Sequence, residues 1–271
     1  MNVLSLFDGM SCGQIALNQL GFKIDNYFAS EIDKDAMKIA KKNFPNMQHI
    51  GDVTKVKGSE LPKIDLLIGG SPCQGFSFAG KQLNFNDPRS ALFFEFVRLF
   101  KETNPKYFLL ENVRMKTEYQ DVITEHLNWI EPIAINSSLV SAQNRNRLYW
   151  TNIPDVDQPT DKNIMLKDIL DNDAEEPMLS NIYGGFKERK PRIHYGKSVT
   201  IRTAAGGGHI PSITLKTGNY RTISPTECEK LQTVPVGYTE GVSNTQRYKM
   251  LGNGWTVDVI KHIFGNMNEL S

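Results

Sequence analysis

The sequence is short of several features that would assign it quickly to a class. Its 271 residues include only 3 cysteines, and Cys12, Cys73 and Cys228 form neither a CxxC pair nor a metal-ligand spacing. An odd number of widely spaced cysteines, without an export signal, favours a reducing, intracellular setting. The formal net charge is +1. Bulk charge therefore does not indicate a nucleic-acid partner, and any basic surface must be local.

Long apolar segments are also missing. Residues 1–7 have no basic region and are too few for a signal peptide. No stretch approaches the roughly 18 apolar residues of a membrane span. The GxGxxG pattern is absent as well, which disfavours a dinucleotide cofactor. We therefore expect a cytoplasmic protein that does not bind a membrane.

What the sequence does contain is an alternation of strand and helix patterns over its first half. Apolar runs predict strands at residues 3–7, 23–29, 47–50, 64–68, 107–110 and 148–151, and helical periodicity falls at 14–20, 33–43, 91–102 and 119–129. Asp33 is a plausible N-cap for the second helix. This order predicts an α/β fold with a mainly parallel, doubly wound sheet.

The composition changes after residue 151. Residues 155–176 hold eight acids against two lysines, and residues 187–202 hold six bases against one acid. Such runs can simply be solvated faces. We interpret 153–222 as a small, irregular lobe beside a main domain at 1–152. Helical patterns at 225–232 and 255–264 predict that 223–271 rejoin the main domain.

Polar and glycine residues follow the first three predicted strands. The turn Phe7-Asp8-Gly9-Met10-Ser11-Cys12-Gly13 follows the first strand, Glu31 the second and Asp52 the third. Glycines there allow a close approach of the backbone to a ligand, and carboxylates can accept hydrogen bonds from ribose hydroxyls or an adenine amine. The alternative is that the glycines serve helix packing and the acids cap helices. The pattern favours a nucleoside-binding site.

A second group of residues carries reactive chemistry. Cys73 follows a proline just past the strand at 64–68, Glu111 ends the strand at 107–110, and Arg145 and Arg147 alternate with asparagines. A thiol, a carboxyl group and two guanidinium groups suit attack on an electron-poor ring. The alternatives are an inert thiol, a salt bridge from Glu111 to Arg114, and a surface strand.

Together these segments resemble the cytosine-C5 DNA methyltransferase family. The resemblance rests on segments that occur in the family's order: residues 7–13, Glu31, 51–53, 71–77, 111–113, 143–147, 221–228 and 251–257. It covers most of the chain except about 153–220. The end of the chain, 254–260, is similar to the animal de novo branch.

The resemblance implies a Rossmann-like methyltransferase fold that binds S-adenosylmethionine and releases S-adenosylhomocysteine. The residues implied to line the cofactor pocket are Phe7, Asp8, Gly9, Gly13, Glu31, Ile32, Asp52, Val53, Asn253 and Trp255. Many family members have a large aromatic residue where this chain has Ile32, so adenine stacking is expected to come from elsewhere, and Trp255 is one source.

The family mechanism implies a role for each reactive residue. Cys73 adds to C6 of a flipped cytosine, Glu111 donates to N3, Arg145 contacts O2 or orients Glu111, and Arg147 completes the catalytic set. The expected DNA contacts are Gln74, Ser77 and Arg89 on the loop after Cys73, and Arg189, Arg192 and Lys197 in the target-recognition lobe.

Three other functions are alternatives to a DNA methyltransferase. A tRNA cytosine methyltransferase shares these motifs but carries a Cys-Phe-Thr tripeptide that this chain lacks. A non-catalytic DNA-binding paralogue is expected to have lost Cys73, Glu111 or Arg145. An oxidoreductase is disfavoured by the missing dinucleotide pattern. The sequence thus predicts a monomeric bacterial or phage enzyme that acts on double-stranded DNA and associates with the nucleoid. Whether it has a cognate restriction endonuclease as a partner is left open by the sequence.

Overall fold

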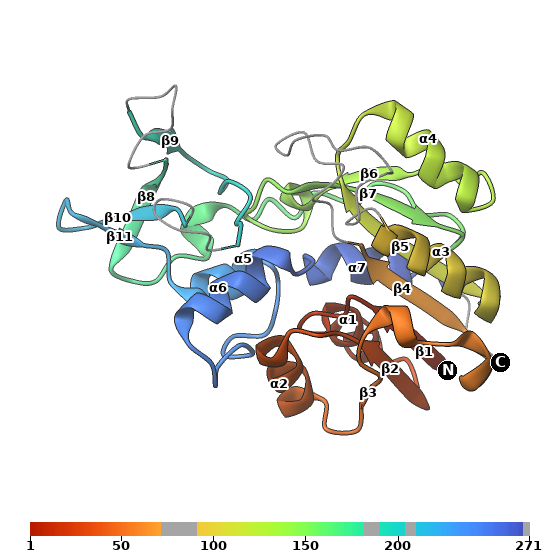
Figure 1. The fold of residues 1–271 in the computed structure, drawn as a ribbon. Helices are drawn as coiled ribbons and strands as arrows, with labels where there is room; N and C mark the ends of the chain where they lie inside the picture. The colour runs from red at the N-terminus through yellow and green to blue at the C-terminus, as the bar shows by residue number, and fades with distance from the viewer. Residues whose placement is uncertain (72–90, 182–189, 204–209, 268–271) are drawn as a thin grey trace. The chain divides into compact units, whose positions relative to one another are not determined.

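The computed structural model describes residues 1–71, 91–181, 190–203 and 210–267. These residues form two compact units (Figure 1), each of which is built from separate stretches of chain. Unit 1 contains residues 1–135, 146–158 and 261–271, and unit 2 contains 136–145 and 159–260. Across the described ranges, no helix is long and apolar enough to cross a membrane.

Unit 1 is built around a seven-stranded sheet with the order β3-β2-β1-β4-β5-β7-β6. Its strands are β1 (Asn2–Leu6), β2 (Asn26–Ser30), β3 (Gln48–His49), β4 (Leu66–Gly70), β5 (Tyr107–Val113), β6 (Ile133–Asn136) and β7 (Asn146–Thr151). Strands β1 to β5 pair in parallel, whereas β7 is antiparallel to β5. The predicted α/β class with a mainly parallel sheet is confirmed.

The helices of unit 1 are α1 (Cys12–Gln19), α2 (Lys34–Asn43), α3 (Ala91–Thr103) and α4 (Thr117–His126). Asp33 caps α2, as predicted, because its carboxylate accepts from the backbone N–H groups of Asp35 and Ala36. Short 3-10 helices occur at Val53–Lys55 and Gly58–Glu60 in unit 1, and at Ser137–Leu139 and Leu166–Asp168 in unit 2.

One face of the sheet forms the core of unit 1. Leu4, Leu67 and Phe108 are neighbours in register on adjacent strands and are buried. Phe93 and Phe96 of α3 belong to the same cluster of buried side chains. Because alternate strand residues face opposite sides, Glu111 and Tyr149 lie on the face opposite Leu110 and Trp150. The apolar face thus fixes which side the acid occupies.

Unit 2 contains a four-stranded antiparallel sheet with the order β11-β10-β8-β9. Its strands are β8 (Ala174–Ser180), β9 (Arg192–His194), β10 (Ser212–Leu215) and β11 (Tyr220–Thr222), and its helices are α5 (Pro225–Leu231), α6 (Asn244–Asn253) and the first half of α7 (Val257–Phe264). The region expected to be irregular therefore contains a small sheet.

The unit boundaries differ from the expected 1–152, 153–222 and 223–271. Residues 223–260 belong to unit 2, and only the segment from residue 261 onward belongs to unit 1. Buried polar side chains explain this difference. Gln143 donates to the carbonyl of Leu231, and Arg145 donates to the carbonyls of Gly252 and Gly254. These bonds tie the segment 136–145 and the C-terminal helices into one body.

Candidate active site

The carboxyl ends of the parallel strands of unit 1 gather the candidate residues. Because β1, β2, β4 and β5 are parallel neighbours, they end at the same edge of the sheet. Asp8 follows β1, Glu31 follows β2, Ser71 follows β4, and Glu111 lies near the end of β5. The edge where an open α/β sheet binds its ligands therefore carries the carboxyl groups of Asp8, Glu31 and Glu111.

The turn after β1 has an unusual backbone. Phe7, Gly9 and Ser11 have φ angles of 56°, 59° and 64°. Left-handed conformations are costly for residues other than glycine and often occur at functional sites. The turn leads directly into α1, and Gly13 is buried in the first turn of that helix.

Asp8 organises this turn. Its carboxylate accepts hydrogen bonds from Ser5 Oγ at 2.6 Å, from Tyr27 Oη at 2.8 Å, and from Ser11 Oγ. Burial raises the pKa of the Asp8 carboxyl from 3.8 to about 6, while the three hydroxyl donors oppose that rise. Asp8 therefore binds a proton more readily in the folded protein than in the unfolded chain.

This pKa gives a pH dependence of stability. Between pH 3.8 and about 6 the folded state holds more protons on Asp8 than the unfolded state does. The free energy of unfolding therefore falls as pH rises through this window, by at most about 3 kcal/mol. In Asp8→Asn this part of the pH dependence should be absent from denaturation curves recorded between pH 4 and 7.

A second variant, Tyr27→Phe, should enlarge the pH-dependent loss of stability that Asp8→Asn removes. Tyr27→Phe removes a donor that favours the charged carboxylate, so the pKa of Asp8 should rise further and the loss of stability should extend to higher pH. If Asp8→Asn kept the wild-type pH profile, the assignment of this titration to Asp8 would be wrong.

Glu31 is held by backbone donors. Its Oε2 accepts from the N–H of Gly9 at 2.8 Å, and its Oε1 accepts from the N–H groups of Ile32 and Asp33 at 2.7 and 2.8 Å. A carboxylate has about four acceptor sites, so the pair of oxygens keeps capacity for a ligand hydroxyl. The neighbouring Ile32 side chain is 74% exposed and offers an apolar contact beside that carboxylate.

Asp52 follows β3 and caps the 3-10 helix Val53–Lys55. Its Oδ1 accepts from the N–H and the hydroxyl of Thr54 at 3.0 and 2.9 Å. The backbone bond from Thr54 contributes most to lowering the pKa of Asp52, so the group is an anionic acceptor at neutral pH. Val53 is buried in the core cluster of unit 1.

Glu111 and Arg147 form an ion pair at the end of β5. Arg147 Nε lies 2.9 Å from Glu111 Oε1, and both side chains are largely buried. The register explains the pair, since Glu111 is opposite Tyr149 and Val113 is opposite Arg147. Residues diagonal on one face of an antiparallel ladder are within reach of a long side chain. Glu111 is also paired in register with Gly70, the last residue of β4.

The chain leaves β4 next to this pair. Ser71 is buried, and its Oγ accepts from Asn112 Nδ2 at 3.1 Å. This bond ties the end of β4 to β5 just before Cys73. Cys73, Gln74, Ser77 and Arg89 lie outside the described residues. Their assignments therefore stay predictions.

Arg145 has a different environment in unit 2. It is buried, and its guanidinium donates to the backbone carbonyls of Ile201 at 3.3 Å, Gly252 at 3.2 Å and Gly254 at 2.8 Å. Within unit 2, Arg145 thus binds the backbone around the C-terminal end of α6, and its predicted role at the target base stays a prediction.

That end of α6 carries the two C-terminal residues that the resemblance assigned to the cofactor. Asn253 is exposed and Trp255 is half-buried. Gly252, just before them, packs against the backbone of the segment 202–203. A Cβ at Gly252 would lie 2.3 Å from the carbonyl carbon of Arg202 and 2.4 Å from the nitrogen of Thr203. Only glycine fits this close approach.

The two described basic residues of the recognition lobe also differ. Arg192 is exposed on β9. Lys197 Nζ donates to the carbonyls of Ser138 at 2.7 Å, Ser141 at 3.1 Å and Ile164 at 2.6 Å. An ammonium group has three donors, so those of Lys197 are all engaged within the protein. Arg189 and the glycines at 206–208 lie outside the described residues.

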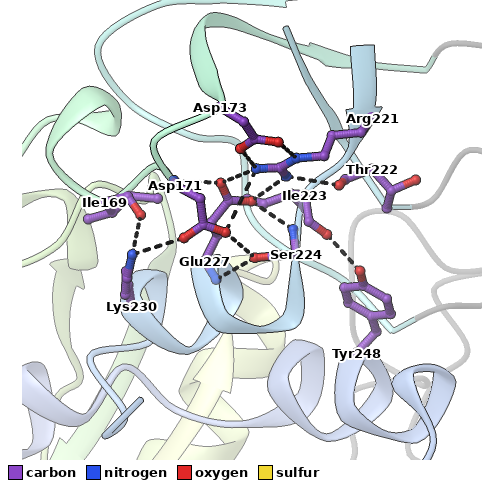
Figure 2. A network of polar contacts seen from close by, with 10 residues as sticks. All are labelled: Ile169, Asp171, Asp173, Arg221, Thr222, Ile223, Ser224, Glu227, Lys230 and Tyr248. Carbon is purple, nitrogen blue, oxygen red and sulfur yellow. Dashed lines mark hydrogen bonds and ion pairs between the residues drawn. The ribbon is translucent and has the colours of Figure 1, made fainter. Parts of the chain in front are cut away.

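An ionic network that sequence reasoning missed joins the small sheet of unit 2 to α5 (Figure 2). Arg221 of β11 pairs with Asp173 at 2.9 Å and with Glu227 at 2.8 Å. Glu227 is fully buried and also completes a capping box with Ser224. Lys230 reaches Asp171 at 3.3 Å. The sequence signal was Ser224 followed three residues later by Glu227, which is the pattern of a capping box.

Comparison with known proteins defines the class. The family model for C-5 cytosine-specific DNA methylase matches residues 1–182 and 116–269. Type II methyltransferase M1.ScrFI of Lactococcus lactis subsp. cremoris is 33% identical, over 99% of this chain and 78% of its own length. M.HhaI of Haemophilus parahaemolyticus is 27% identical, over 98% and 94%. This chain belongs to the C-5 cytosine-specific DNA methylase family.

Solved structures support the same fold. The Entamoeba histolytica methyltransferase EhMeth aligns with a TM-score of 0.75 at 18% identity, over 99% of each chain. A mutant of Spodoptera frugiperda DNMT2 aligns with a TM-score of 0.73 at 21% identity, over 98% of each chain. At these identities the likeness shows the methyltransferase fold alone.

Proposed function

We propose that this protein is a DNA (cytosine-5-)-methyltransferase that acts on a short duplex target. The observation that carries the proposal is the ion pair of Glu111 with Arg147, in which Glu111 is in register with Gly70 at the end of β4, two residues before Pro72. The family model matches residues 1–182 and 116–269 of the same chain. A carboxyl group held in this way can bind the Watson–Crick edge of a cytosine while a nearby thiolate attacks the ring.

The residues of unit 1 fit the methyl donor that the family uses in general, S-adenosylmethionine. Glu31 would hold the ribose hydroxyls and Asp52 the adenine amine, Ile32 would add an apolar contact beside Glu31, and the turn at Phe7, Asp8 and Gly9 would approach with its backbone. When bound, the donor supplies an electrophilic methyl group on a sulfonium. The resemblance also assigns Asn253 and Trp255 to the cofactor, and we keep that assignment as a proposal.

The chemistry of the chain's own residues follows from a weakness of the substrate, since C5 of cytosine is a poor nucleophile. The Cys73 thiolate forms a bond to C6, and Glu111 donates a proton to N3, so that the ring becomes an enamine. C5 then takes the methyl group. Water then takes the C5 proton, the bond between sulfur and C6 breaks, and the N3 proton returns to Glu111, which restores the aromatic ring, the thiolate and the acid. Arg147 keeps Glu111 oriented. Arg145, which also holds the backbone of unit 2, is proposed to contact O2 of the base.

The target base must leave the duplex to reach such a site, at a cost of a few kcal/mol. Gln74, Ser77 and Arg89 are proposed to offset that cost by contacts with the DNA, and Arg189 and Arg192 to hold it in the recognition lobe. We further propose a monomer, encoded by a bacterium or phage, that associates with the nucleoid and is paired with a cognate restriction endonuclease.

The test is a direct assay of methyl transfer. Purified protein is incubated with labelled S-adenosylmethionine and either duplex DNA or tRNA, and bisulfite sequencing then maps the modified cytosines. We expect 5-methylcytosine at one short recurring DNA sequence and no label in tRNA. Label in tRNA alone would establish the RNA-acting alternative, and label in neither would refute the proposed activity.

The salt dependence of DNA binding separates phosphate contacts from structural lysines. Replacing Arg189 and Arg192 by alanine should reduce the slope of log affinity against log salt by about 2, since each phosphate contact contributes about 0.9. Lys197→Ala should leave that slope unchanged and lower the melting temperature, because three carbonyls lose their donor. A flatter slope in Lys197→Ala would return that residue to the DNA interface.

A further inference from the structure

A fully buried glutamine holds the segment that carries Asn253 and Trp255. Gln232 follows α5 and has no exposed surface. Its Nε2 donates to the carbonyl of Leu251 at 2.7 Å and to that of Gly254 at 3.1 Å. These two acceptors flank the pair Gly252-Asn253, so the side chain bridges the last turn of α6 to the residue that follows it.

The other end of the same carboxamide is also occupied. Gln232 Oε1 accepts from Thr256 Oγ1 at 2.8 Å and from Gln143 Nε2 at 3.2 Å. The backbone carbonyl of Gln232 accepts from the N–H of Val257 at 2.9 Å. Both donors and both acceptor positions of the side chain are therefore satisfied, and the two carbonyls facing Nε2 fix the orientation of the amide.

The network continues to the segment 136–145 of the same unit. Thr256 Oγ1 accepts from Ser137 Oγ at 2.8 Å, and Gln143 Oε1 accepts from the N–H of Ile201 at 2.9 Å. Arg145 donates to the carbonyls of Gly252 and Gly254. The carbonyls of Leu251, Gly252 and Gly254 thus all accept hydrogen bonds from buried side chains of unit 2.

Such an arrangement does more than fill space. A leucine at position 232 would bury a similar volume but would leave buried donors and acceptors unpaired, which is destabilising. Saturated buried polar networks specify one backbone conformation rather than merely adding stability. Here the specified backbone is the one that presents exposed Asn253 and half-buried Trp255.

We propose that Gln232 is a positioning residue for cofactor binding, acting through the backbone of the segment 251–256. The inference rests on the proposed function, because Asn253 and Trp255 are proposed there to contact S-adenosylmethionine. Gln232 itself touches no ligand. Its carboxamide holds the segment in the conformation that binds, so that affinity for the cofactor depends on a residue buried behind the binding surface.

The test compares variants that differ in this network alone. Gln232→Glu keeps the shape but places an oxygen against the carbonyls of Leu251 and Gly254. Thr256→Val removes the hydroxyl that donates to Gln232, and Thr256→Ser keeps it. Calorimetry measures the binding of S-adenosylhomocysteine to the ligand-free protein, and a separate titration measures duplex DNA binding. Steady-state rates supply KM for S-adenosylmethionine and kcat.

We expect Gln232→Glu and Thr256→Val to bind S-adenosylhomocysteine roughly tenfold more weakly, as loss of a buried hydrogen bond allows. KM for S-adenosylmethionine should rise more than kcat falls, duplex affinity should stay unchanged, and Thr256→Ser should restore the wild-type affinity. Arg221→Lys is the matched control, since it weakens a buried ion pair of unit 2 that does not touch 251–256.

Three outcomes would overturn the inference. Variants of Gln232 and Thr256 with wild-type affinity for S-adenosylhomocysteine and only a lower melting temperature would reduce the network to a structural role. The same loss of affinity in Arg221→Lys would attribute the effect to general destabilisation. A wild-type protein that failed to bind S-adenosylhomocysteine at all would instead refute the proposed function, and the inference with it.

Discussion

Cys73→Ser should abolish methyl transfer, with a loss of at least about 10⁴-fold in turnover, as expected when a covalent nucleophile is removed. A serine hydroxyl remains protonated at neutral pH, whereas a thiol supplies a thiolate that can add to C6. Duplex DNA binding should remain, because the substitution changes one atom. The measurements are turnover with labelled donor and a gel-shift titration of the duplex.

A covalent trap tests the same step independently of rate. With 5-fluorocytosine in the duplex the final proton loss is blocked, so wild-type protein should form a stable adduct in the presence of S-adenosylmethionine, and Cys73→Ser should form none. Cys228→Ala is the control. Burial holds the pKa of the Cys228 thiol far above its usual range, so that thiol is inert and its removal should leave the trap intact. An active Cys73→Ser protein would refute the nucleophile assignment.

Glu111→Gln should lower kcat by about 10²–10⁴, the range typical of a lost general acid. The amide keeps the shape of the side chain but cannot transfer a proton to N3, and it loses the ion pair with Arg147. Arg147→Lys should lower kcat less, because it removes only the group that orients the acid. Single-turnover rates with saturating cofactor and duplex provide the measurement.

The double variant shows whether the two residues act as one unit. If Arg147 works through Glu111, combining Glu111→Gln with Arg147→Lys should be no worse than Glu111→Gln alone. Glu118→Gln on α4 is the matched control, since Glu118 is exposed and pairs only loosely with Lys116 at 3.5 Å. Fully additive losses from Glu111→Gln and Arg147→Lys would contradict the coupled role of the pair.

Much of unit 1 could be predicted because local patterns and long-range structure agree there. The apolar run at 64–68 marks β4, and the periodicity at 91–102 marks α3 within one residue at its C-terminal end. Asp33 caps α2 as its position suggested. The antiparallel direction of β7 could not be predicted in this way, because the pattern of a short strand is the same in either direction.

Unit 2 was harder for a physical reason. Its strands β9 and β11 have three residues each and include Arg192, Arg221 and other polar side chains, so no alternating apolar pattern marks them. Its cohesion depends on buried polar side chains such as Gln232 and Glu227, which sequence reasoning assigns to the surface by default. The helix α6 was missed because its apolar periodicity is weak.

The site itself was predicted only in part. The edge that gathers Asp8, Glu31 and Glu111 follows from the alternation of strands and helices. The pairing of Arg147 with Glu111 does not, because it depends on the register of β7 against β5, which brings Arg147 to the diagonal position beside Glu111. The hydrogen bonds of Lys197 to three carbonyls could not be predicted from the sequence either, since a lysine within a basic run has the pattern of a DNA contact.

The strand order of unit 1 has a consequence for how the nascent chain is completed on the ribosome. β6 is made before β7, yet in the finished sheet β7 lies between β5 and β6. After its synthesis, β6 therefore has no strand to pair with in the final sheet order until residues 146–151 of β7 emerge. The strand that brings Arg147 to Glu111 is thus also the strand that joins β6 to the sheet. In a chain stalled before residue 146, neither β6 nor the Glu111 side chain should be held in its final position.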